Sequence, residues 1–397
     1  MRQISLLALT KSTGGIALYN KLLLSELRRI GVRSHTLCLS ENSEAYAADL
    51  TRRGLGAEPV EMARYSIDLG GDARVLRRVI EASREQDADV IVCHGSKSGF
   101  IGRAAGRITG RPVVYRQASM PFQRRVQGAK APFYWALDFA ARGFGGHVVT
   151  LTDHARDQTL RAKLMPPERV SVIRTGVDVD RFRPARERAE ARRALGLDPE
   201  RPVVGWMGRI EPQKAPLDYV EALRDLVARY PHVQFVMAGE GRLQAEVDQA
   251  LQAAGLAGRV RMLGWQADPV AALQAFDVYV LSSHWEGLPI TLLEAMACGC
   301  CCISTDVDGC SDALEDGISG RLVAAADTTG LARALNSVLH DPELRCRYAA
   351  AGRERAVTLF DKETMVAKWV ELLSQLTAGR ASVPVAGAAG AASEGGQ

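Results

Sequence analysis

The sequence predicts an α/β protein with two doubly wound domains, each a parallel sheet covered by helices on both faces. Short apolar runs alternate with amphipathic stretches along nearly the whole chain, as expected for buried parallel strands separated by helices. A charged segment punctuated by Pro and Gly interrupts this alternation once, at residues 175–201. The length of 397 residues exceeds one ordinary core and suits two domains of roughly 150–200 residues each.

Each half of the chain supplies its own series of strands. In the first half we expect strands at Ile4–Leu9, His35–Leu39, Val90–Cys93, Pro112–Tyr115, His147–Leu151 and Val170–Ile173. In the second half we expect them at Val203–Met207, Gln234–Ala238, Arg259–Leu263, Val278–Leu281 and Cys301–Ser304. Two such domains that face each other place the carboxyl ends of both sheets on one cleft, which is where open α/β sheets bind ligands.

These signals divide the chain into four regions. We place a first domain at residues 1–178, a second at 179–360, a final helix at 361–377 and a disordered Ala/Gly/Ser-rich tail at 378–397. The content of 47% apolar and 24% charged residues is that of a soluble globular protein. No run reaches the ~18 apolar residues that a membrane span needs. Ile4–Leu9 is too short for a signal-peptide core, so we place the protein in the cytoplasm.

Five of the eight cysteines crowd into residues 298–310, which raises the question of a metal site. They are Cys298, Cys300, Cys301, Cys302 and Cys310. The cluster contains neither a pair of CxxC arms nor a His, which a zinc site of the common kind would show. Free Cys is among the most buried residue types, so we interpret the cluster as buried thiols and expect no metal ion or other cofactor.

The net charge of +4 is unevenly distributed. From Lys97 to Arg142, nine basic residues, among them Arg124 and Arg125, stand against one acid, Asp138, and aromatic residues lie between them. Three interpretations stay open: a surface for anionic lipid, a site for a phosphorylated or lipid-diphosphate ligand, and an ordinary solvated face. Nucleic acid is not expected as a partner, because the chain contains no recognised binding module.

The most informative segment is Ser282–Gly299, which reads SSHWEGLPITLLEAMACG. It follows a predicted strand and contains a helix with Pro289 in its first turn. The free N–H groups and the positive dipole end at the start of this helix make a natural diphosphate site. Glu286 precedes the helix and Glu294 lies one turn into it, so the two could reach sugar and ribose hydroxyls. Taken alone, however, their spacing favours a purely structural interpretation, in which one glutamate caps an ordinary helix and the other is exposed to solvent.

This segment resembles the signature of the retaining family 4 glycosyltransferases of GT-B fold: Glu, seven residues, Glu, then Ala-Met-Ala-Cys-Gly. Further stretches resemble other segments of that family: GWMGRIEPQKAP, MAGEGRL, VRMLGW and the hinge-like TGVDVDRF. The resemblance covers residues 1–377 and is strongest from 170 to 325. It implies two Rossmann-like domains facing across a cleft, with the last helix, about Lys362–Leu376, crossing back to the first domain.

The resemblance also implies a role for each matching residue. Glu286 would contact the donor sugar and Glu294 the ribose, while Arg209 and Lys214 would bind the diphosphate and assist its departure. The rest of the donor site would comprise Gly14, Gly15, Gly208, Gly239, Glu240, Gly287, Leu288 and Ile290. The acceptor would attack from the leaving-group face with retention, and the donor phosphate would serve as base. Neither a protein nucleophile nor a metal ion is then expected.

The first domain departs from the family at one position. Many members carry a His after the strand that corresponds to Pro112–Tyr115, where it contacts the donor sugar. This chain reads RQASMPF and has Ala118 at that place, preceded by Gln117, so an altered sugar contact or altered activity stays open. His94, in VCHGSKSG, follows a strand, and a site role and a structural role are equally open. The candidates on the acceptor side are His94, Gln117, Arg124 and Arg125.

The resemblance therefore implies sugar transfer from a nucleotide-sugar to a glycan or polyprenyl-diphosphate-linked acceptor, in cell-envelope or exopolysaccharide assembly. A UDP-sugar is the favoured donor, and a GDP-sugar stays open. Peripheral attachment to the inner face of the plasma membrane also stays open. Two alternatives remain: a non-catalytic nucleotide-sugar-binding protein, which would bind donor without transfer, and a sugar-nucleotide epimerase on the same fold, which would turn over donor without an acceptor.

Overall fold

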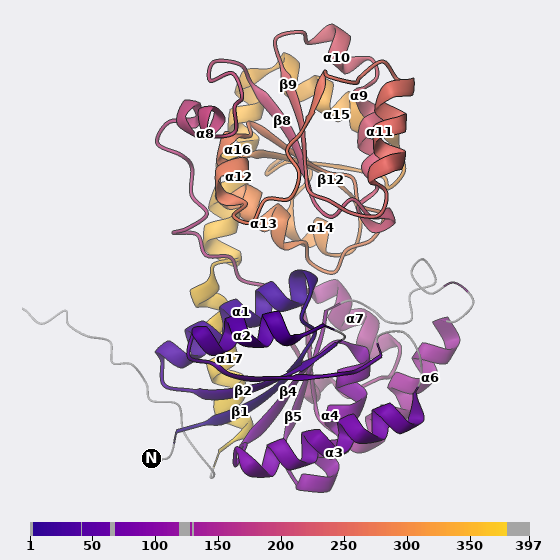
Figure 1. Ribbon diagram of the computed structural model, residues 1–397, viewed down its shortest axis with the longest axis vertical. Helices are drawn as coiled ribbons and strands as arrows, with labels where there is room; N and C mark the ends of the chain where they lie inside the picture. Colours follow the sequence, from indigo (N-terminus) through magenta and orange to yellow (C-terminus); the bar gives the residue numbers. More distant parts are fainter. Residues whose placement is uncertain (1–2, 41, 64–67, 119–127, 129–130, 379–397) are drawn as a thin grey trace, which may run out of the picture. The chain divides into compact units, whose positions relative to one another are not determined.

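The structure is a computed structural model that describes all residues except 1–2, 41, 64–67, 119–127, 129–130 and 379–397. The chain divides into two compact units. The first comprises Met1–Arg116, Ala141–Val148 and Val366–Gln397, and the second comprises Gln117–Ala140 and Val149–Met365. The strands form two separate sheets, shown in Figure 1, and they confirm the predicted α/β class with two parallel-sheet domains.

The first sheet has seven strands in the order β3-β2-β1-β4-β5-β6-β7. They are β1 (Ser5–Thr10), β2 (Arg33–Leu39), β3 (Gly56–Val60), β4 (Val90–His94), β5 (Val113–Gln117), β6 (His147–Thr150) and β7 (Val170–Val172). β1 pairs in parallel with β2 on one side and with β4 on the other. All six strands predicted for this half are present, with ends shifted by one or two residues. The sequence does not predict β3, a partly exposed edge strand that contains Pro59.

Helices cover the first sheet. They are α1 (Gly14–Arg29), α2 (Glu44–Arg52), α3 (Leu69–Glu85), α4 (Ser96–Thr109), α6 (Ala131–Ala141) and α7 (Asp153–Arg161), with 3-10 turns η2 (Arg142–Phe144) and η3 (Pro167–Arg169). Residues of α3 and α4 pack on strands β1, β2 and β4 in one core. None of the helices among the described residues combines the length and the apolar character needed to span a membrane.

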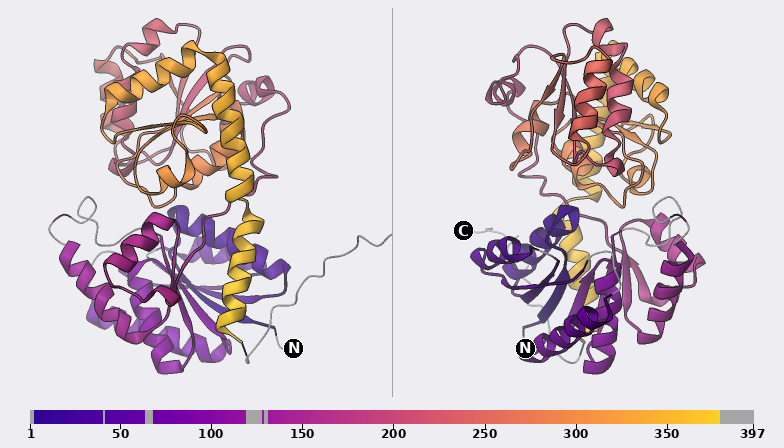
Figure 2. Two further views of the ribbon diagram at one scale, coloured as in Figure 1. Left: turned by 180° about the vertical axis from the view of Figure 1, so that it is seen from behind. Right: turned by 45° about the vertical axis from the view of Figure 1, so that its right-hand side comes forward.

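The last helix, α17 (Lys362–Leu376), returns to the first sheet. Nε1 of Trp369 in α17 donates to the hydroxyl of Tyr19 in α1 at 2.6 Å. At its start, Lys362 donates to a carboxylate oxygen of Asp178 at 2.9 Å. Figure 2 shows this helix following α16 near the end of the chain. The helix predicted to cross back to the first domain is therefore confirmed.

The second sheet has six strands in the order β10-β9-β8-β11-β12-β13, and neighbouring strands run parallel. They are β8 (Val203–Met207), β9 (Gln234–Ala238), β10 (Val260–Met262), β11 (Val278–Leu281), β12 (Cys301–Thr305) and β13 (Arg321–Val323). The predicted bounds of β8, β9 and β11 are correct to the residue. β13 is a three-residue edge strand without a buried residue, and the sequence does not predict it.

Helices lie on both faces of the second sheet. They are α8 (Arg188–Ala194), η4 (Pro212–Lys214), α9 (Pro216–Leu223), α10 (Leu226–Arg229), α11 (Gln244–Ala253), α12 (Val270–Ala275), α13 (Ile290–Ala297), α14 (Gly309–Ala313), α15 (Thr328–His340) and α16 (Pro342–Leu359). Alternate residues of one strand enter opposite cores: Val280 joins the core that contains Trp206, and Tyr279 joins the other. Both faces of the sheet are therefore buried, as its continuous apolar strands predict.

The clustered cysteines lie inside these two cores. All five are fully buried and are free thiols, which confirms their interpretation as small buried apolar residues. Burial raises the pKa of Cys300 to about 11 and that of Cys301 to about 12. Both thiols therefore stay protonated at neutral pH and are poor nucleophiles.

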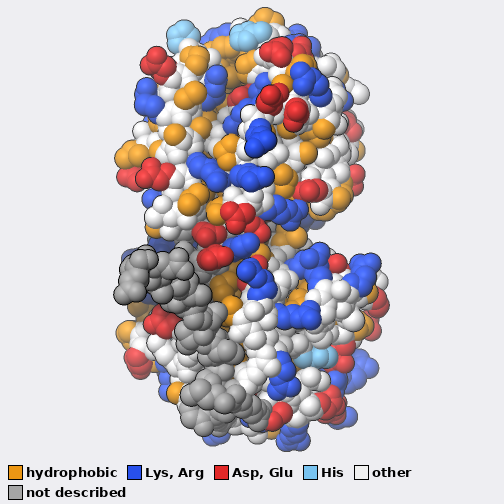
Figure 3. Space-filling model, turned by 90° about the vertical axis from the view of Figure 1, so that its left-hand side faces the viewer, with side chains coloured by type: hydrophobic (Ala, Val, Ile, Leu, Met, Phe, Trp, Pro, Cys, Tyr) orange, Lys and Arg blue, Asp and Glu red, His pale blue; other side chains and the backbone are white. Residues whose placement is uncertain are grey.

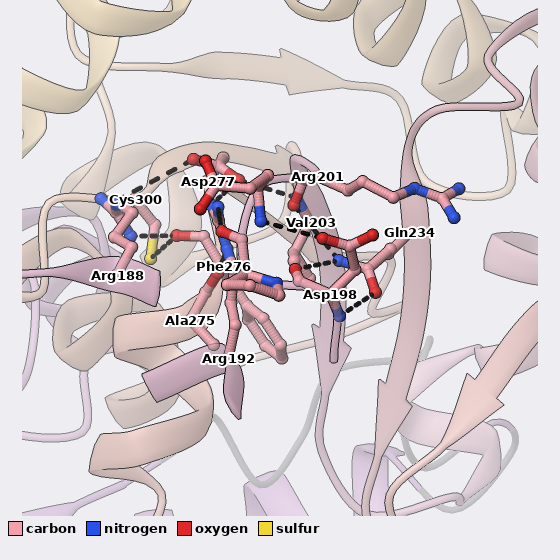
Figure 4. Close-up of polar contacts among 12 residues, drawn as sticks. Arg188, Arg192, Asp198, Arg201, Val203, Gln234, Ala275, Phe276, Asp277 and Cys300 are labelled. Carbon is pink, nitrogen blue, oxygen red and sulfur yellow. Dashed lines mark hydrogen bonds and ion pairs between the residues drawn. The ribbon is translucent and has the colours of Figure 1, made fainter. Parts of the chain in front are cut away.

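A network of charged side chains fastens α8 to the second sheet (Figure 4). Asp277, just before β11, accepts from Arg192 at 2.6 Å and from the backbone N–H of Val203 at 2.7 Å. Arg188 donates to the carbonyl of Gly299 at 2.7 Å. This network anchors α8, the helix within the charged segment 175–201. Removing one partner would leave a shielded charge uncompensated, which costs about 3–5 kcal/mol in comparable buried pairs.

Candidate active site

Several of the sequence-predicted residues meet at the carboxyl ends of β8 and β11. β8 continues through Gly208 and Arg209 into η4, which ends at Lys214. β11 continues through a loop to Glu286, followed by α13. Because the two strands are adjacent and parallel, both loops leave the sheet at the same edge. The strand order reverses between β8 and β11, and such a reversal is where open α/β sheets bind ligands.

A shielded ion pair joins the two loops. Nζ of Lys214 lies 2.5 Å from Oε1 of Glu286, and both side chains are largely shielded from solvent. The hydroxyl of Ser283 donates to the same carboxylate oxygen at 2.7 Å. Oε2 of Glu286 makes no hydrogen bond to any residue that the structure describes. One oxygen therefore holds the carboxylate in place, and the other is available to accept a hydrogen bond.

Backbone contacts hold the loop around Glu286. The side chain of Gln213 donates to the carbonyl of Trp285 at 3.0 Å, and the backbone carbonyl of Gln213 accepts from the N–H of His284 at 2.9 Å. The ring of His284 lies 2.8 Å from a carboxylate oxygen of Asp218 in α9. These bonds tie η4 and α9 to the loop after β11. They fix the loop geometry before any substrate contact, which lowers the ordering that binding would require.

The start of α13 offers backbone donors beside this carboxylate. Its N-cap, Pro289, has no N–H, and no side chain caps the first turn. The free N–H groups and the positive end of the helix dipole favour an anion at this point. Gly309 packs against Gly287 so closely that a Cβ atom at Gly309 would lie 1.7 Å from the Gly287 carbonyl oxygen. The helix ends at Ala297, and Gly299, the predicted stop, follows its C-cap in a left-handed conformation with φ +71°.

Glu294, the second carboxyl group of the pattern, lies one turn along α13. Its side chain is buried, and within the described residues it makes neither a hydrogen bond nor an ion pair. Burial raises the pKa of this carboxyl group to about 7. A buried carboxyl group without a partner costs folding free energy when it ionises, and such groups concentrate at functional sites.

Glycines bring the ends of β8 and β9 together beside this cluster. A Cβ atom at Gly239 would lie 1.9 Å from the carbonyl oxygen of Gly208, and its φ of +135° favours glycine. The carboxylate of Glu240 accepts from the backbone N–H of Trp265 at 3.3 Å. Arg209 donates to the side-chain amide oxygen of Gln213 in η4 at 3.2 Å. These four predicted donor-site residues therefore lie at the ends of neighbouring strands of one sheet.

The candidates of the first half lie at the carboxyl edge of the other sheet. Gly14 opens α1 with φ +71°, Gly15 follows it, and no side chain caps this helix. Gln117 ends β5, where its side-chain oxygen accepts from the hydroxyl of Thr159 at 3.0 Å. Arg124 and Arg125 lie outside the described residues.

His94 ends β4 and is fully buried. Its ring meets that of Tyr19 edge-on, with centroids 5.8 Å apart. Neither ring nitrogen has a hydrogen-bond partner among the described residues. Burial, reinforced by the nearby Arg116 cation, lowers the pKa of His94 well below its usual value, so the ring is neutral at physiological pH.

Two family models match the chain. The model described as glycosyl transferases group 1 matches residues 187–355, and the model described as glycosyl transferase 4-like domain matches residues 14–176. The UDP-Gal:alpha-D-GlcNAc-diphosphoundecaprenol alpha-1,3-galactosyltransferase of Escherichia coli is 30% identical over 285 residues, which cover 70% of this chain and 73% of the relative. This chain belongs to the group 1, family 4 glycosyltransferases.

Further comparisons agree with this family. The alpha-D-kanosaminyltransferase of Streptomyces kanamyceticus is 34% identical to this chain over 290 residues, which cover 69% of this chain and 74% of the relative. The crystal structure of Anabaena Alr3699/HepE in complex with UDP and glucose superposes with a TM-score of 0.82 at 21% identity, covering 94% of this chain and 100% of that one. This likeness confirms the GT-B fold.

Sequence reasoning missed two residues that set the geometry of Glu286 in this glycosyltransferase. Ser283 bonds the carboxylate directly, and Gln213 anchors the loop that carries it. The available signal was positional: a Ser three residues before Glu286 and a Gln next to Lys214. Ser and Gln are common in loops, so their contacts become visible only when the two strand ends are placed side by side.

Proposed function

We propose that this glycosyltransferase moves a sugar, with retention of anomeric configuration, from a UDP-sugar to a lipid-linked or glycan acceptor. The printed name of the Escherichia coli relative supports this, because it specifies UDP-Gal as donor and a diphosphoundecaprenol-linked GlcNAc as acceptor. Membership of the retaining family supports retention. We propose cell-envelope or exopolysaccharide assembly as the process and the cytoplasmic side of the membrane as its place.

The observation that carries the proposal is the Lys214–Glu286 pair beside the start of α13. Departure of UDP places negative charge on the diphosphate. Lys214, Arg209 and the first N–H groups of α13 supply positive charge at one edge of the sheet, where they would stabilise the leaving group. The free oxygen of Glu286 would accept hydrogen bonds from hydroxyl groups of the donor sugar. Glu294 would accept hydrogen bonds from the ribose.

The proposed bond changes take place on one face of the sugar. The acceptor hydroxyl attacks the anomeric carbon from the side on which the diphosphate leaves. The bond between the anomeric carbon and the phosphate oxygen breaks, and its electron pair goes to UDP while the glycosidic bond forms. A phosphate oxygen of the departing UDP takes the hydroxyl proton. We propose that neither a protein nucleophile nor a metal ion takes part.

A donor panel tests this function. The purified protein is incubated with UDP-, GDP- and dTDP-sugars, and both the melting temperature and the released nucleotide are measured. We expect one UDP-sugar to stabilise the protein and to be slowly hydrolysed, with faster release when an undecaprenyl-diphosphate-linked sugar is added. The new linkage should keep the anomeric configuration of the donor, as read by NMR, and EDTA should leave the rate unchanged.

Three outcomes would contradict parts of the proposal. Preference for a GDP-sugar would correct the donor, and inversion of the anomeric configuration would refute the same-face step. Conversion of the donor to an epimer without any acceptor would assign a different reaction to the site. Loss of activity in EDTA, restored by a divalent cation, would overturn the metal-free step.

A further inference from the structure

Helix α6 has the reverse of the usual surface pattern. Its only charged residue, Asp138, is 6% exposed, whereas Phe133 is 49% exposed, Trp135 38% and Leu137 36%. A surface helix normally buries its apolar stripe and turns its charges to solvent. The outward face of α6 is therefore apolar, and it requires an explanation beyond the packing of the first sheet.

The apolar face spans the whole outward side of the helix. At about 100° per residue, Phe133 and Leu137 lie on one edge of this face and Trp135 lies on the other. The strip between these edges holds the exposed residues Pro132, Ala136 and Ala140 and the half-buried Phe139, all of them small or apolar. No charged side chain interrupts the face.

The indole of Trp135 is held in a fixed position. Its Nε1 donates to the carbonyl of Ala162 at 3.3 Å, and its ring stacks on Phe139 with centroids 5.0 Å apart. The polar atom of the indole is therefore satisfied within the protein, and the exposed part of the ring is apolar. A rigid aromatic ring of this kind offers contact area with little loss of side-chain entropy on binding.

Exposed aromatic residues concentrate in this part of the chain. Beyond α6, Phe144 of η2 and Phe100 of α4 are both exposed and meet edge-on with centroids 5.6 Å apart. Of the five Phe and Trp side chains exposed in the described chain, four lie between residues 100 and 144. On the face shown in Figure 3, by contrast, hydrophobic side chains lie scattered among charged ones, as on an ordinary protein surface.

We propose that the outward face of α6 docks on the surface of an anionic lipid bilayer. Phe and Trp are suited to the boundary between head groups and acyl chains, where exposed apolar faces insert. An exposed arginine, Arg142, follows directly after α6. The only acid of this basic stretch, Asp138, is buried, so it adds little repulsion of lipid phosphates.

The structure indicates that lipid binding by this surface would depend more on aromatic contact than on charge. Of the nine basic residues of the stretch, Lys97 pairs with Asp72 at 2.6 Å, and Arg111 pairs with Asp87 at 3.2 Å. Arg103 and Arg116 are buried. Vesicle binding should therefore depend strongly on the α6 side chains and only moderately on salt. The inference rests on the proposed function in one respect: a lipid-linked acceptor is presented at a bilayer.

The test compares two triple variants of the full chain by co-sedimentation with vesicles of phosphatidylcholine and phosphatidylglycerol. Phe133→Ser/Trp135→Ser/Leu137→Ser removes the α6 face. Its matched control replaces three exposed apolar residues elsewhere: Ile318→Ser, Val357→Ser and Leu359→Ser. We expect the α6 variant to lose at least about tenfold in partitioning to the vesicles, and the control to bind like the unmodified protein. Should the triple variant not fold, the single variant Phe133→Ser should still show a loss of a few fold.

Donor hydrolysis in vesicle-free buffer and the oligomeric state separate the possible results. Unchanged hydrolysis together with lost vesicle binding supports the docking face. Equal losses in both triple variants, or no vesicle binding by the unmodified protein, would overturn it. A dimer of the unmodified protein that becomes monomeric in the α6 variant would also overturn it, because a second copy of the chain would then cover the face. Absence of donor hydrolysis with intact vesicle binding would contradict the proposed function alone.

Discussion

Replacing Glu294 by Gln should make the protein more stable at alkaline pH and leave it nearly unchanged in acid. Burial raises the folded-state pKa of this carboxyl group to about 7, from an ordinary value of 4.5. When the pKa of a carboxyl group is higher in the folded than in the unfolded state, the group makes its full contribution to stability only at pH values below the unfolded-state pKa. Its contribution is lost as the pH rises towards the folded pKa. Gln has nearly the same shape as a protonated Glu but cannot ionise, so the variant avoids this loss.

The size of the effect follows from the shift. At 1.36 kcal/mol per pKa unit, ionisation of Glu294 costs about 3 kcal/mol near pH 8 and less than about 1 kcal/mol near pH 5. These values are upper limits, because local relaxation and water entry reduce the cost of a buried charge. We expect Glu294→Gln to exceed the unmodified protein in unfolding free energy by about 1–3 kcal/mol near pH 8, with a difference close to zero near pH 5.

Urea unfolding across this pH range measures the difference. Glu354→Gln is the matched control, because Glu354 is an exposed glutamate inside helix α16 and its replacement should give no pH-dependent difference. A difference for Glu294→Gln that stays flat with pH would refute the reasoning. So would a variant that is less stable at alkaline pH, since that result would show that the ionised carboxylate has a favourable partner in the folded protein.

Three further changes test the cluster at the ends of β8 and β11. Glu286→Gln should lower sugar transfer at least about a hundredfold while the far-UV circular dichroism stays unchanged, since it removes the proposed acceptor for sugar hydroxyls; transfer at the normal rate would contradict that role. Ser283→Ala should lower kcat about tenfold with little change in KM, because it removes a charge-assisted hydrogen bond to Oε1 of Glu286. Ser311→Ala alters an exposed serine of α14 and is the control. An equal loss of kcat in this control would contradict a specific role for Ser283. Gly239→Ala should destabilise the protein by about 3 kcal/mol in urea unfolding, because the new Cβ atom would meet the Gly208 carbonyl at 1.9 Å; Gly255→Ala, with nothing within 4 Å of its Cβ position, is the control for strain from positive φ alone.

The elements that the sequence predicts best are those buried on both faces. β8, β9 and β11 are predicted to the residue because each is a continuous apolar run at the centre of a sheet. β3 and β13 stand at sheet edges, where one side of the strand meets no other strand, and their side chains are only partly buried. A strand of this kind needs no apolar run, so the pattern that reveals the others is missing.

The site could be predicted as a set of residue types at strand ends, but not as a set of contacts. Both Lys214 and Glu286 follow a buried strand in the family pattern, and the adjacency of β8 and β11 makes them neighbours. Their direct contact depends on how η4 and the loop after β11 fold, which Gln213 and Ser283 control. For His94 the pattern left the role open, and the structure adds that the ring is buried against Tyr19 of α1 and has a lowered pKa.

The Lys214–Glu286 pair gives the proposed site an order of events. Lys214 contacts Glu286 in this structure, and the proposed role gives the same cation a second partner, the donor diphosphate. A diphosphate carries more negative charge than one carboxylate, so it would draw the ammonium away from Glu286. The carboxylate would then be a shielded charge with Ser283 as its remaining donor, and the hydroxyl groups of the donor sugar would replace the lost cation. Binding of the diphosphate would therefore leave Glu286 short of hydrogen-bond donors, and a correctly placed sugar would supply them. A nucleotide without the sugar would leave Glu286 undercompensated, which favours binding of the complete donor over binding of the free nucleotide product.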